Sequence, residues 1–215
     1  HDMKNPIKNL EHILSGSILT NLSAEEHKKV MSLLSEQLKY TGLTMENSIL
    51  WVKQQMDGLK VNKTKFNLTE LIQTNILLIK DSIDRKSIQI KLDLEKDFSV
   101  YGDRDVYNIV VRNLLSNAIK FSYPETGIIE IFQTLSEGKH WVSVKDNGQG
   151  IELDKLNMIF SQNESTFGTM QESGYGLGLK LVKSFLNNIN EDIKVESTVD
   201  KGSVFSFTIT KNTVN

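Results

Sequence analysis

Apolar side chains recur every three or four positions through the first 59 residues of the chain, with one polar break near residue 20. This spacing places them on one face of a helix, so it predicts two amphipathic helices with a short connection. Within the break, Ser23 stands three residues before Glu26, which is the capping-box signal for the start of the second helix. The apolar positions are Ile7, Leu10, Leu14 and Ile18, then Val30, Leu34, Leu38, Thr41, Met45, Ile49, Val52, Met56 and Leu59.

Two helices joined by a short connection are antiparallel neighbours, so residues 1–60 are predicted to form a helical hairpin domain. A hairpin alone leaves much of its apolar seam exposed to water. We therefore expect two copies of the chain to pair as a homodimer whose helices form a four-helix bundle.

After Gly58 the pattern changes to helices that alternate with strands. Helices are predicted at residues 69–84, from a cap at Asp103 to residue 121, at 153–160 and at 176–188. Strands are predicted at 88–94, near 100, at 128–135, at 141–146, and in a final hairpin of 193–198 and 203–209. The fold class is therefore α+β, with residues 61–215 expected to form an α/β sandwich domain that has helices on one face of a mixed, mostly antiparallel sheet.

Charge and composition narrow the possible partners. The chain has 25 Lys and Arg against 27 Asp and Glu, a net charge of −2, so no basic surplus predicts binding to nucleic acid or to an anionic membrane.

The lack of cysteine excludes disulfides, zinc-cysteinate sites, iron–sulfur clusters and thiol catalysis, and fits a reducing cytoplasmic setting. The longest stretch without a formal charge, residues 12–24, is too short to span a bilayer. Because the chain begins with His1 and lacks a signal-peptide pattern, we expect an excised fragment.

A polar stripe on a predicted helix is the first candidate for chemistry. Asn113 and Asn117 lie four residues apart on one helix face, with Lys120 close by. Asn carbonyl oxygens suit Mg²⁺, and a Lys ammonium suits phosphate. By itself, the stripe is equally well explained as the solvated face of an amphipathic helix.

Two glycine motifs follow in the same domain. Asp-Asn-Gly-Gln-Gly at residues 146–150 directly follows a predicted strand, so Asp146 could accept a hydrogen bond from an adenine amino group while the glycines let the backbone approach the base. Alone, this motif is also typical of a tight turn. Gly-Tyr-Gly-Leu-Gly-Leu at residues 174–179 opens a helix whose free N–H groups suit a phosphate chain, with a flexible hinge as the alternative.

In this order, the asparagine stripe and the two glycine motifs resemble the N, G1 and G2 boxes of the ATP-binding fold shared by histidine kinases, type II topoisomerases, chaperones and mismatch-repair ATPases. The resemblance covers residues 66–209, and Ile159-Phe160 looks like the F box before the ATP lid. It implies ATP and Mg²⁺ as cofactors, with Asn117 as the Mg²⁺ ligand. The residues it implies for nucleotide binding are Asn113, Asn117, Lys120, Asp146, Gly148, Gly150, Phe160, Gly174, Gly176, Leu177 and Gly178.

Residues 1–6, His-Asp-Met-Lys-Asn-Pro, look like the H box of histidine kinases. The whole chain therefore resembles the catalytic core of a two-component sensor histidine kinase. This resemblance implies that ATP phosphorylates His1 and that the phosphoryl group passes to an aspartate on the receiver domain of a response regulator, with phosphatase activity on that regulator. In this scheme Asp2 holds or accepts the proton on the other ring nitrogen of His1, and Asn5 orients water on the phospho-aspartate. The full-length protein is then expected to be membrane-anchored.

Two departures accompany the resemblance. Asn190-Glu191-Asp192 stands where such kinases often have a Gly-Gly pair, and residues 161–167 lack the basic residue that many relatives place in the lid, for which Lys180 or Lys183 could substitute. Two other functions stay open. One is an ATP-hydrolysing conformational machine of the same superfamily, and the other is a degenerate scaffold that binds nucleotide or a partner without transferring phosphate.

Overall fold

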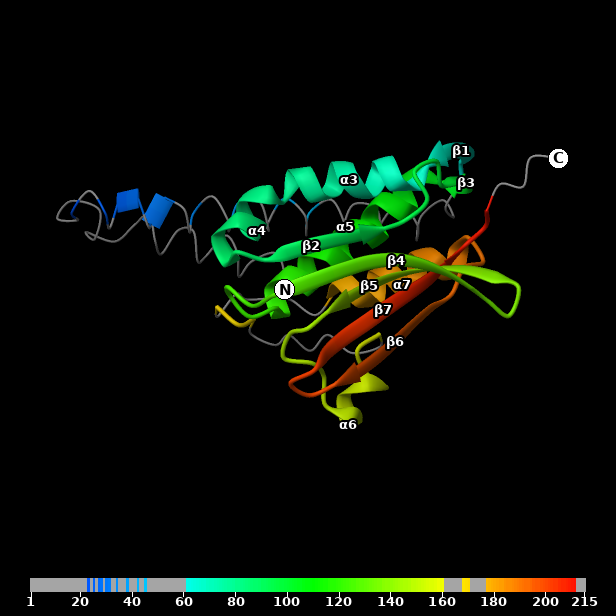
Figure 1. Ribbon diagram of the computed structural model, residues 1–215. Helices are drawn as coiled ribbons and strands as arrows, with labels where there is room; N and C mark the ends of the chain where they lie inside the picture. Colours follow the sequence, from blue (N-terminus) through cyan, green and yellow to red (C-terminus); the bar gives the residue numbers. More distant parts are fainter. Residues whose placement is uncertain are drawn as a thin grey trace. The chain divides into compact units, whose positions relative to one another are not determined.

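The computed structural model describes residues 61–160, 168–170 and 177–211 continuously, together with ten positions between residues 23 and 45 (Figure 1). The chain divides into two compact units, His1–Leu59 and Lys60–Asn215. In this described part of the chain, no helix has both the length and the apolarity that a bilayer crossing requires.

The described positions of the first unit are helical from Glu25 to Met45. Ser23 lies outside the helix, and its carbonyl accepts a hydrogen bond from the His27 amide at 2.9 Å. A helix that starts just after Ser23 is therefore confirmed. Glu26 and the first predicted helix, residues 7–18, lie outside the described residues.

One side of this helix is apolar and exposed. Met31, Leu38 and Met45 follow each other at intervals of seven residues and are 62%, 59% and 53% exposed, whereas Leu34 is buried. Residues seven apart lie on the same side of a helix, two turns from one another. The first unit therefore carries an apolar stripe that is not covered within the described part of the chain.

Five strands of the second unit form one mixed sheet. Their order is β2 (Gln89–Asp93), β4 (Ile128–Ser136), β5 (Lys139–Asp146), β7 (Gly202–Ile209) and β6 (Ile193–Thr198). The β2–β4 pair is parallel, and the pairs β4–β5, β5–β7 and β6–β7 are antiparallel. The predicted mixed, mostly antiparallel sheet and the α+β class are confirmed.

Helices cover one face of this sheet. In Figure 1, α5 (Arg104–Phe121) and α7 (Leu177–Asn188) lie together behind the strands, and α3 (Leu68–Leu78) packs against α5. The core lies between these helices and the sheet, as expected for an α/β sandwich. Its fully buried members include Val110, Leu115, Ile129, Val142, Val182, Phe185, Leu186 and Phe207.

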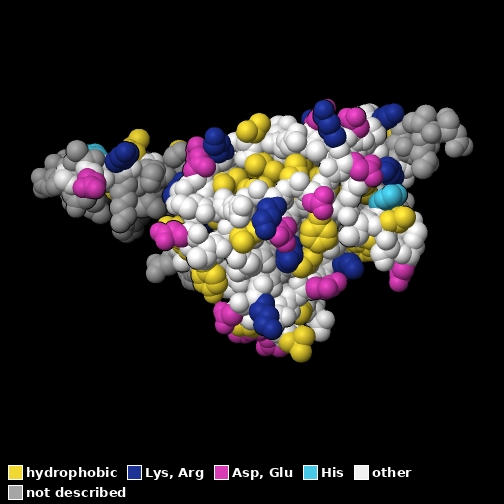
Figure 2. All heavy atoms as spheres, in the orientation of Figure 1, with side chains coloured by type: hydrophobic (Ala, Val, Ile, Leu, Met, Phe, Trp, Pro, Cys, Tyr) yellow, Lys and Arg dark blue, Asp and Glu magenta, His cyan; other side chains and the backbone are white. Residues whose placement is uncertain are grey.

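Charged side chains stand in register on the other face of the sheet. Lys91, Glu130 and Lys145 lie side by side on β2, β4 and β5, with Nζ–Oε distances of 3.1 and 2.8 Å. Figure 2 shows basic and acidic side chains intermixed over the face that it presents. Exposed pairs of this kind contribute at most about 1 kcal/mol each, so the apolar face carries the stability of the sheet.

Two predicted helices differ from the observed ones. Residues 69–84 were expected as one helix, but they belong to α3 and α4 (Lys80–Lys86), which are separated at Ile79. The Ile79 amide donates to the Ile76 carbonyl at 3.3 Å, an i to i−3 bond that tightens the chain and ends α3. The apolar spacing continues through both helices, so periodicity alone does not reveal the break. The helix predicted at 153–160 is shorter, because α6 spans only Leu153–Leu156.

One strand is not predicted by the sequence pattern. β1 (Lys63–Asn67) pairs antiparallel with β3 (Ser99–Asp103) in a separate two-stranded sheet. Its side chains are mostly polar and exposed, so it lacks the alternation that marks a strand. Asp103 caps α5, as predicted, because its Oδ1 accepts the amides of Asp105 and Val106 at 3.1 and 3.3 Å.

The segment that departs from a Gly-Gly pair ends α7. Asn190 adopts a left-handed conformation with φ +62°, its amide donates to the Asn187 carbonyl at 3.1 Å, and the Glu191 amide donates to the Leu186 carbonyl at 2.9 Å. These two bonds define a Schellman helix end. Asn190 therefore takes the position that a glycine commonly occupies.

Glu191 itself is buried beside the start of α5. Its carboxylate accepts hydrogen bonds from the hydroxyls of Tyr107 at 3.2 Å, Thr208 at 2.5 Å and Thr210 at 2.8 Å. Burial, followed by the charge of Glu191, raises the pKa of the Tyr107 hydroxyl. This network ties the start of α5 to the end of β7.

Candidate functional site

The asparagine stripe meets the glycine run where α5 and α7 approach each other. The Asn113 side-chain nitrogen donates to the Ile109 carbonyl at 2.8 Å. The Asn113 Oδ1 faces Gly178 in the first turn of α7, where a Cβ would lie only 2.6 Å from that oxygen. A side chain at 178 would force the Asn113 amide out of this position. The structure thus brings together two predicted nucleotide-binding residues that are distant in the sequence.

Asn117 and Lys120 continue the stripe toward the end of α5. Both are half-buried, and no described residue forms a hydrogen bond with the Asn117 side chain, whose carbonyl oxygen could therefore bind a ligand. The Lys120 ammonium lies 4.7 Å from the centre of the Phe121 ring. In the described part of the chain there is no cluster of three or more His, Asp or Glu residues suited to a metal. A divalent cation here would depend on Asn117 and on oxygens of the bound molecule.

Asp146 is a buried carboxylate at the end of β5. The residue is 4% exposed, and its Oδ1 accepts the Gly148 amide at 2.9 Å and the Ser203 amide at 3.3 Å. Burial raises the pKa of Asp146 to about 6, and the two amide bonds act in the opposite direction. No described residue donates a hydrogen bond to Oδ2. The second oxygen is thus left to accept a donor from a ligand.

The loop after Asp146 is clamped against the end of α5 and against the last hairpin. A Cβ at Gly148 would lie 2.1 Å from the Phe121 carbonyl oxygen, which also accepts the Gln149 amide at 3.1 Å. Gly150 adopts φ +68°, and a Cβ there would lie 2.1 Å from the Thr198 carbonyl oxygen. The loop is a bend and not the tight turn that Asn-Gly favours, because neither Asn147 nor Gly148 has a positive φ. Its close approaches to the Phe121 and Thr198 carbonyls make it a rigid support for Asp146.

Phe160 also lies beside α7. The Lys183 ammonium of α7 is 5.4 Å from the centre of its half-buried ring, within the range of a cation–π contact. Lys180, the other proposed substitute for a basic lid residue, is exposed. The predicted helix at 176–188 is confirmed as α7, which begins at Leu177.

Several predicted site residues are not tested by the structure. His1, Asp2 and Asn5 lie outside the described residues, as do Gly174 and Gly176. The backbone of Leu177 is described, but its side chain is not. Their roles stay predictions from the sequence.

Two contributors were not among the predicted site residues. Ser203 supplies its amide to Asp146 from the start of β7, and no local pattern distinguishes it. Lys86 is almost fully buried and bonds the end of α5. The sequence does carry a signal for the burial of Lys86, because its spacing from the apolar Ile79 and Ile83 places all three on one side of a helix.

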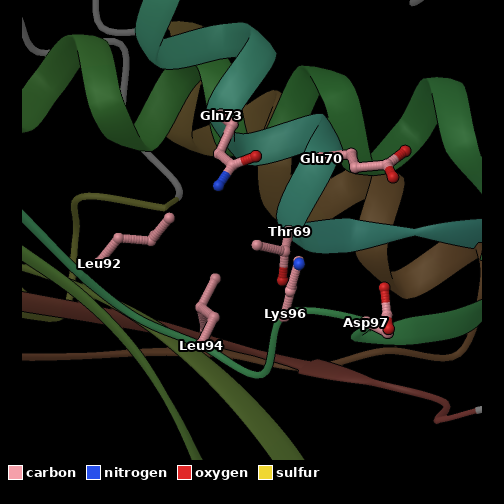
Figure 3. Close-up of a pocket in the computed structure, with 7 residues that line it drawn as sticks. All are labelled: Thr69, Glu70, Gln73, Leu92, Leu94, Lys96 and Asp97. Atoms are coloured by element: carbon pink, nitrogen blue, oxygen red, sulfur yellow. The ribbon is translucent and has the colours of Figure 1, made fainter.

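A separate pocket of about 330 Å³ lies between the start of α3 and the segment that follows β2 (Figure 3). Glu70 and Gln73 line it from α3, and Leu92 and Leu94 line it from the opposite side. Its wall contains no predicted nucleotide-binding residue and no glycine. It therefore differs from the site formed by α5, α7 and the Asp146 loop.

Comparison with known proteins identifies related chains. The family model described as histidine kinase-, DNA gyrase B-, and HSP90-like ATPase matches residues 102–213. Sensor histidine kinase GraS of Staphylococcus haemolyticus is 27% identical over 212 residues, which are 98% of this chain and 59% of that protein. The chain thus spans about three fifths of that relative.

Solved structures give the same result. Histidine kinase AdeS of Acinetobacter baumannii superposes with a TM-score of 0.73 at 21% identity, over 99% of this chain and 98% of that chain, which supports the fold. Histidine kinase ThkA, solved in complex with response regulator protein TrrA, superposes with a TM-score of 0.70 at 25% identity, over 99% of this chain and 59% of that chain.

Proposed function

Because this chain belongs to the family of histidine kinase-, DNA gyrase B- and HSP90-like ATPases, and because relatives aligned along nearly its whole length are sensor histidine kinases, we propose that it is the catalytic core of a protein histidine kinase. It phosphorylates His1 with ATP and passes the phosphoryl group to an aspartate of a response regulator. The observation that carries this proposal is the buried Asp146, with Oδ2 left for a ligand, on a glycine-rich loop at the end of α5, the helix whose Asn113 faces Gly178.

Asp146 recognises the adenine in this proposal. Its Oδ2 accepts a hydrogen bond from the adenine amino group, while Gly148 and Ser203 hold Oδ1. Because both amides belong to clamped backbone, the carboxylate is oriented before the nucleotide arrives. The absence of a side chain on Gly148 keeps the loop against the end of α5.

The phosphates and the cation are assigned to the facing helices. Asn117 offers its amide oxygen to Mg²⁺, and Lys120 adds a positive charge near the phosphates. Gly178, in the first turn of α7, lies where backbone N–H groups have no intrahelical partner, which favours phosphate oxygens. Bound Mg²⁺ would neutralise charge on the transferring phosphoryl group.

His1 is the nucleophile. A ring nitrogen of neutral His1 forms a bond to the γ-phosphorus while the bond from that phosphorus to the bridging oxygen breaks and ADP leaves. Asp2 holds and then accepts the proton of the other ring nitrogen. In the phosphatase reaction, Asn5 orients a water molecule toward the aspartyl phosphate of the regulator, and this water hydrolyses it.

The exposed stripe of the first unit supports the proposed homodimer. Met31, Leu38 and Met45 present more than half of their surface at heptad spacing, which suits burial against a second copy in a four-helix bundle. We assign the regulator's receiver domain as the other partner, in line with the ThkA structure, and place this portion in the cytoplasm of a membrane-anchored sensor.

Incubation with γ-labelled ATP tests the proposal. The protein should acquire a label that acid removes and alkali does not, as expected for phosphohistidine. His1→Gln should abolish the label and leave nucleotide affinity unchanged. His27→Gln, which alters an exposed helical histidine of the same unit, is the matched control and should keep the label.

The outcomes also separate the alternatives. Repeated release of phosphate without protein label would favour an ATP-hydrolysing conformational machine. Nucleotide binding with neither label nor hydrolysis would favour a degenerate scaffold. Label retained by His1→Gln would refute the assignment of the nucleophile.

A further inference from the structure

A buried lysine closes the last turn of the helix that carries the asparagine stripe. Lys86, the last residue of α4, is 3% exposed. Its Nζ lies 2.8 Å from the Ile119 carbonyl oxygen, 2.9 Å from that of Lys120, 3.3 Å from that of Ser122 and 2.8 Å from the Thr169 Oγ1. Carbonyls at the end of a helix lack intrahelical partners and carry partial negative charge. The ammonium supplies both the donors and the opposite charge.

The remaining carbonyl of this turn has a different partner. The Phe121 oxygen accepts the Gln149 amide at 3.1 Å, and the loop passes so close that a Cβ at Gly148 would lie 2.1 Å from that oxygen. Lys86 therefore holds the last turn of α5 through the carbonyls of Ile119 and Lys120. The same turn holds the Asp146 loop through the Phe121 carbonyl.

Thr169 joins the same junction from a segment far along the chain. Its amide donates to the Lys120 carbonyl at 3.1 Å, and its hydroxyl donates to the Ser122 carbonyl at 2.6 Å while accepting from Lys86. The main chain of Lys86 is also fixed, because its carbonyl accepts the Glu125 amide at 2.7 Å. Two segments, the end of α5 and the segment around Thr169, thus converge on the ammonium group of Lys86.

From this arrangement we propose that Lys86 is a positioning residue for the nucleotide site, which it serves by fixing the α5 turn that aligns the Asp146 loop. The inference rests on the proposed nucleotide-binding function. Lys86 acts through the Phe121–Gln149 hydrogen bond. Without its ammonium, the Ile119 carbonyl would lose the donor that Lys86 gives it, the Lys120 and Ser122 carbonyls would keep only their bonds from Thr169, and the turn would loosen. The Phe121 oxygen would move with the turn, and the carboxylate of Asp146 would lose its fixed orientation.

The test is Lys86→Met in the 215-residue chain, since methionine keeps the unbranched apolar stem and removes the donors. We expect the Kd for ADP, measured by calorimetry, to rise at least about tenfold. Hydrogen exchange of the Gln149 amide should also accelerate at least about tenfold relative to the Val144 amide in β5. General destabilisation would accelerate both amides together, so the ratio reports the local turn.

Tyr107→Phe is the matched control. It removes one buried hydrogen bond, to Glu191, near the opposite end of α5. This variant should keep the parent Kd and the parent exchange ratio. Lys86→Arg, which keeps the donors, should recover most of the affinity lost in Lys86→Met. If Lys86→Met does not fold, Thr169→Val gives the same measurements, because it removes an acceptor of the ammonium and a donor to Ser122.

A folded Lys86→Met variant, or Thr169→Val in its place, with the parent Kd and the parent exchange ratio would overturn the proposal. If the parent itself does not bind ADP, the proposed function fails. The exchange ratio of Gln149 to Val144 then still decides whether Lys86 positions the loop, because that measurement needs no nucleotide.

Discussion

Lowering the pH should weaken nucleotide binding because it protonates Asp146. Burial raises the pKa of this carboxyl to about 6, although the amides of Gly148 and Ser203 act in the opposite direction. The ionised Oδ2 can only accept a hydrogen bond, which suits an adenine amino group. A protonated Oδ2 becomes a donor and opposes another donor, so the acid form binds adenine poorly.

The size of the effect follows from the pKa. With a value of about 6, the carboxylate is almost fully ionised at about pH 7.5 and roughly 9% ionised at about pH 5. If the ionised form alone binds, affinity for ADP falls about tenfold over this range, which corresponds to about 1.4 kcal/mol.

Calorimetric titration of ADP into the parent and into Asp146→Asn measures this directly. The Asn variant keeps an oxygen acceptor for the two amides and has no titrating group at this position. Protonation of the ADP phosphates affects both proteins equally, so the ratio of their affinities isolates Asp146. That ratio should shrink about tenfold between about pH 7.5 and pH 5. A ratio that does not change with pH would refute the assignment of Asp146 as the adenine acceptor.

Three further predictions concern stability, metal binding and phosphatase activity. Because the folded-state pKa of Asp146 lies above the unfolded value, the free energy of unfolding falls as the pH rises from about 4 to about 6. Denaturant titration should therefore show that Asp146→Asn is more stable than the parent at about pH 7.5, by up to about 3 kcal/mol, with no gain near pH 4. Asn117→Ala should reduce ADP affinity in Mg²⁺ and leave affinity in EDTA unchanged, and equal losses in both buffers would contradict a metal contact. Asn5→Ala should slow dephosphorylation of a phosphorylated regulator about 10²-fold and leave autophosphorylation within a few-fold, as measured by paired label assays. Equal losses in those two assays would mean that Asn5 only supports the helix around His1.

Local patterns in the sequence were sufficient for most elements of the second unit. The spacing of apolar residues predicts α5, α7 and the strands of the five-stranded sheet, because each of these elements buries one face against the same core. The cap at Asp103 and the glycine motif at 146–150 are also local, since each is recognised from a few consecutive residues. The spacing of apolar residues did not predict β1, because this strand is polar and buries little of its surface. It also did not predict the break at Ile79, because the apolar spacing continues across it.

Only the tertiary structure decided the properties of the site. The pKa of Asp146 depends on burial and on an amide from Ser203, which lies 57 residues away in the sequence. The contact of Asn113 with Gly178 joins two helices, and the ammonium of Lys86 joins α4 to the end of α5. Composition and spacing describe what each segment can form, whereas a carboxylate's proton affinity and a helix end's hydrogen bonds depend on the groups that folding places beside them.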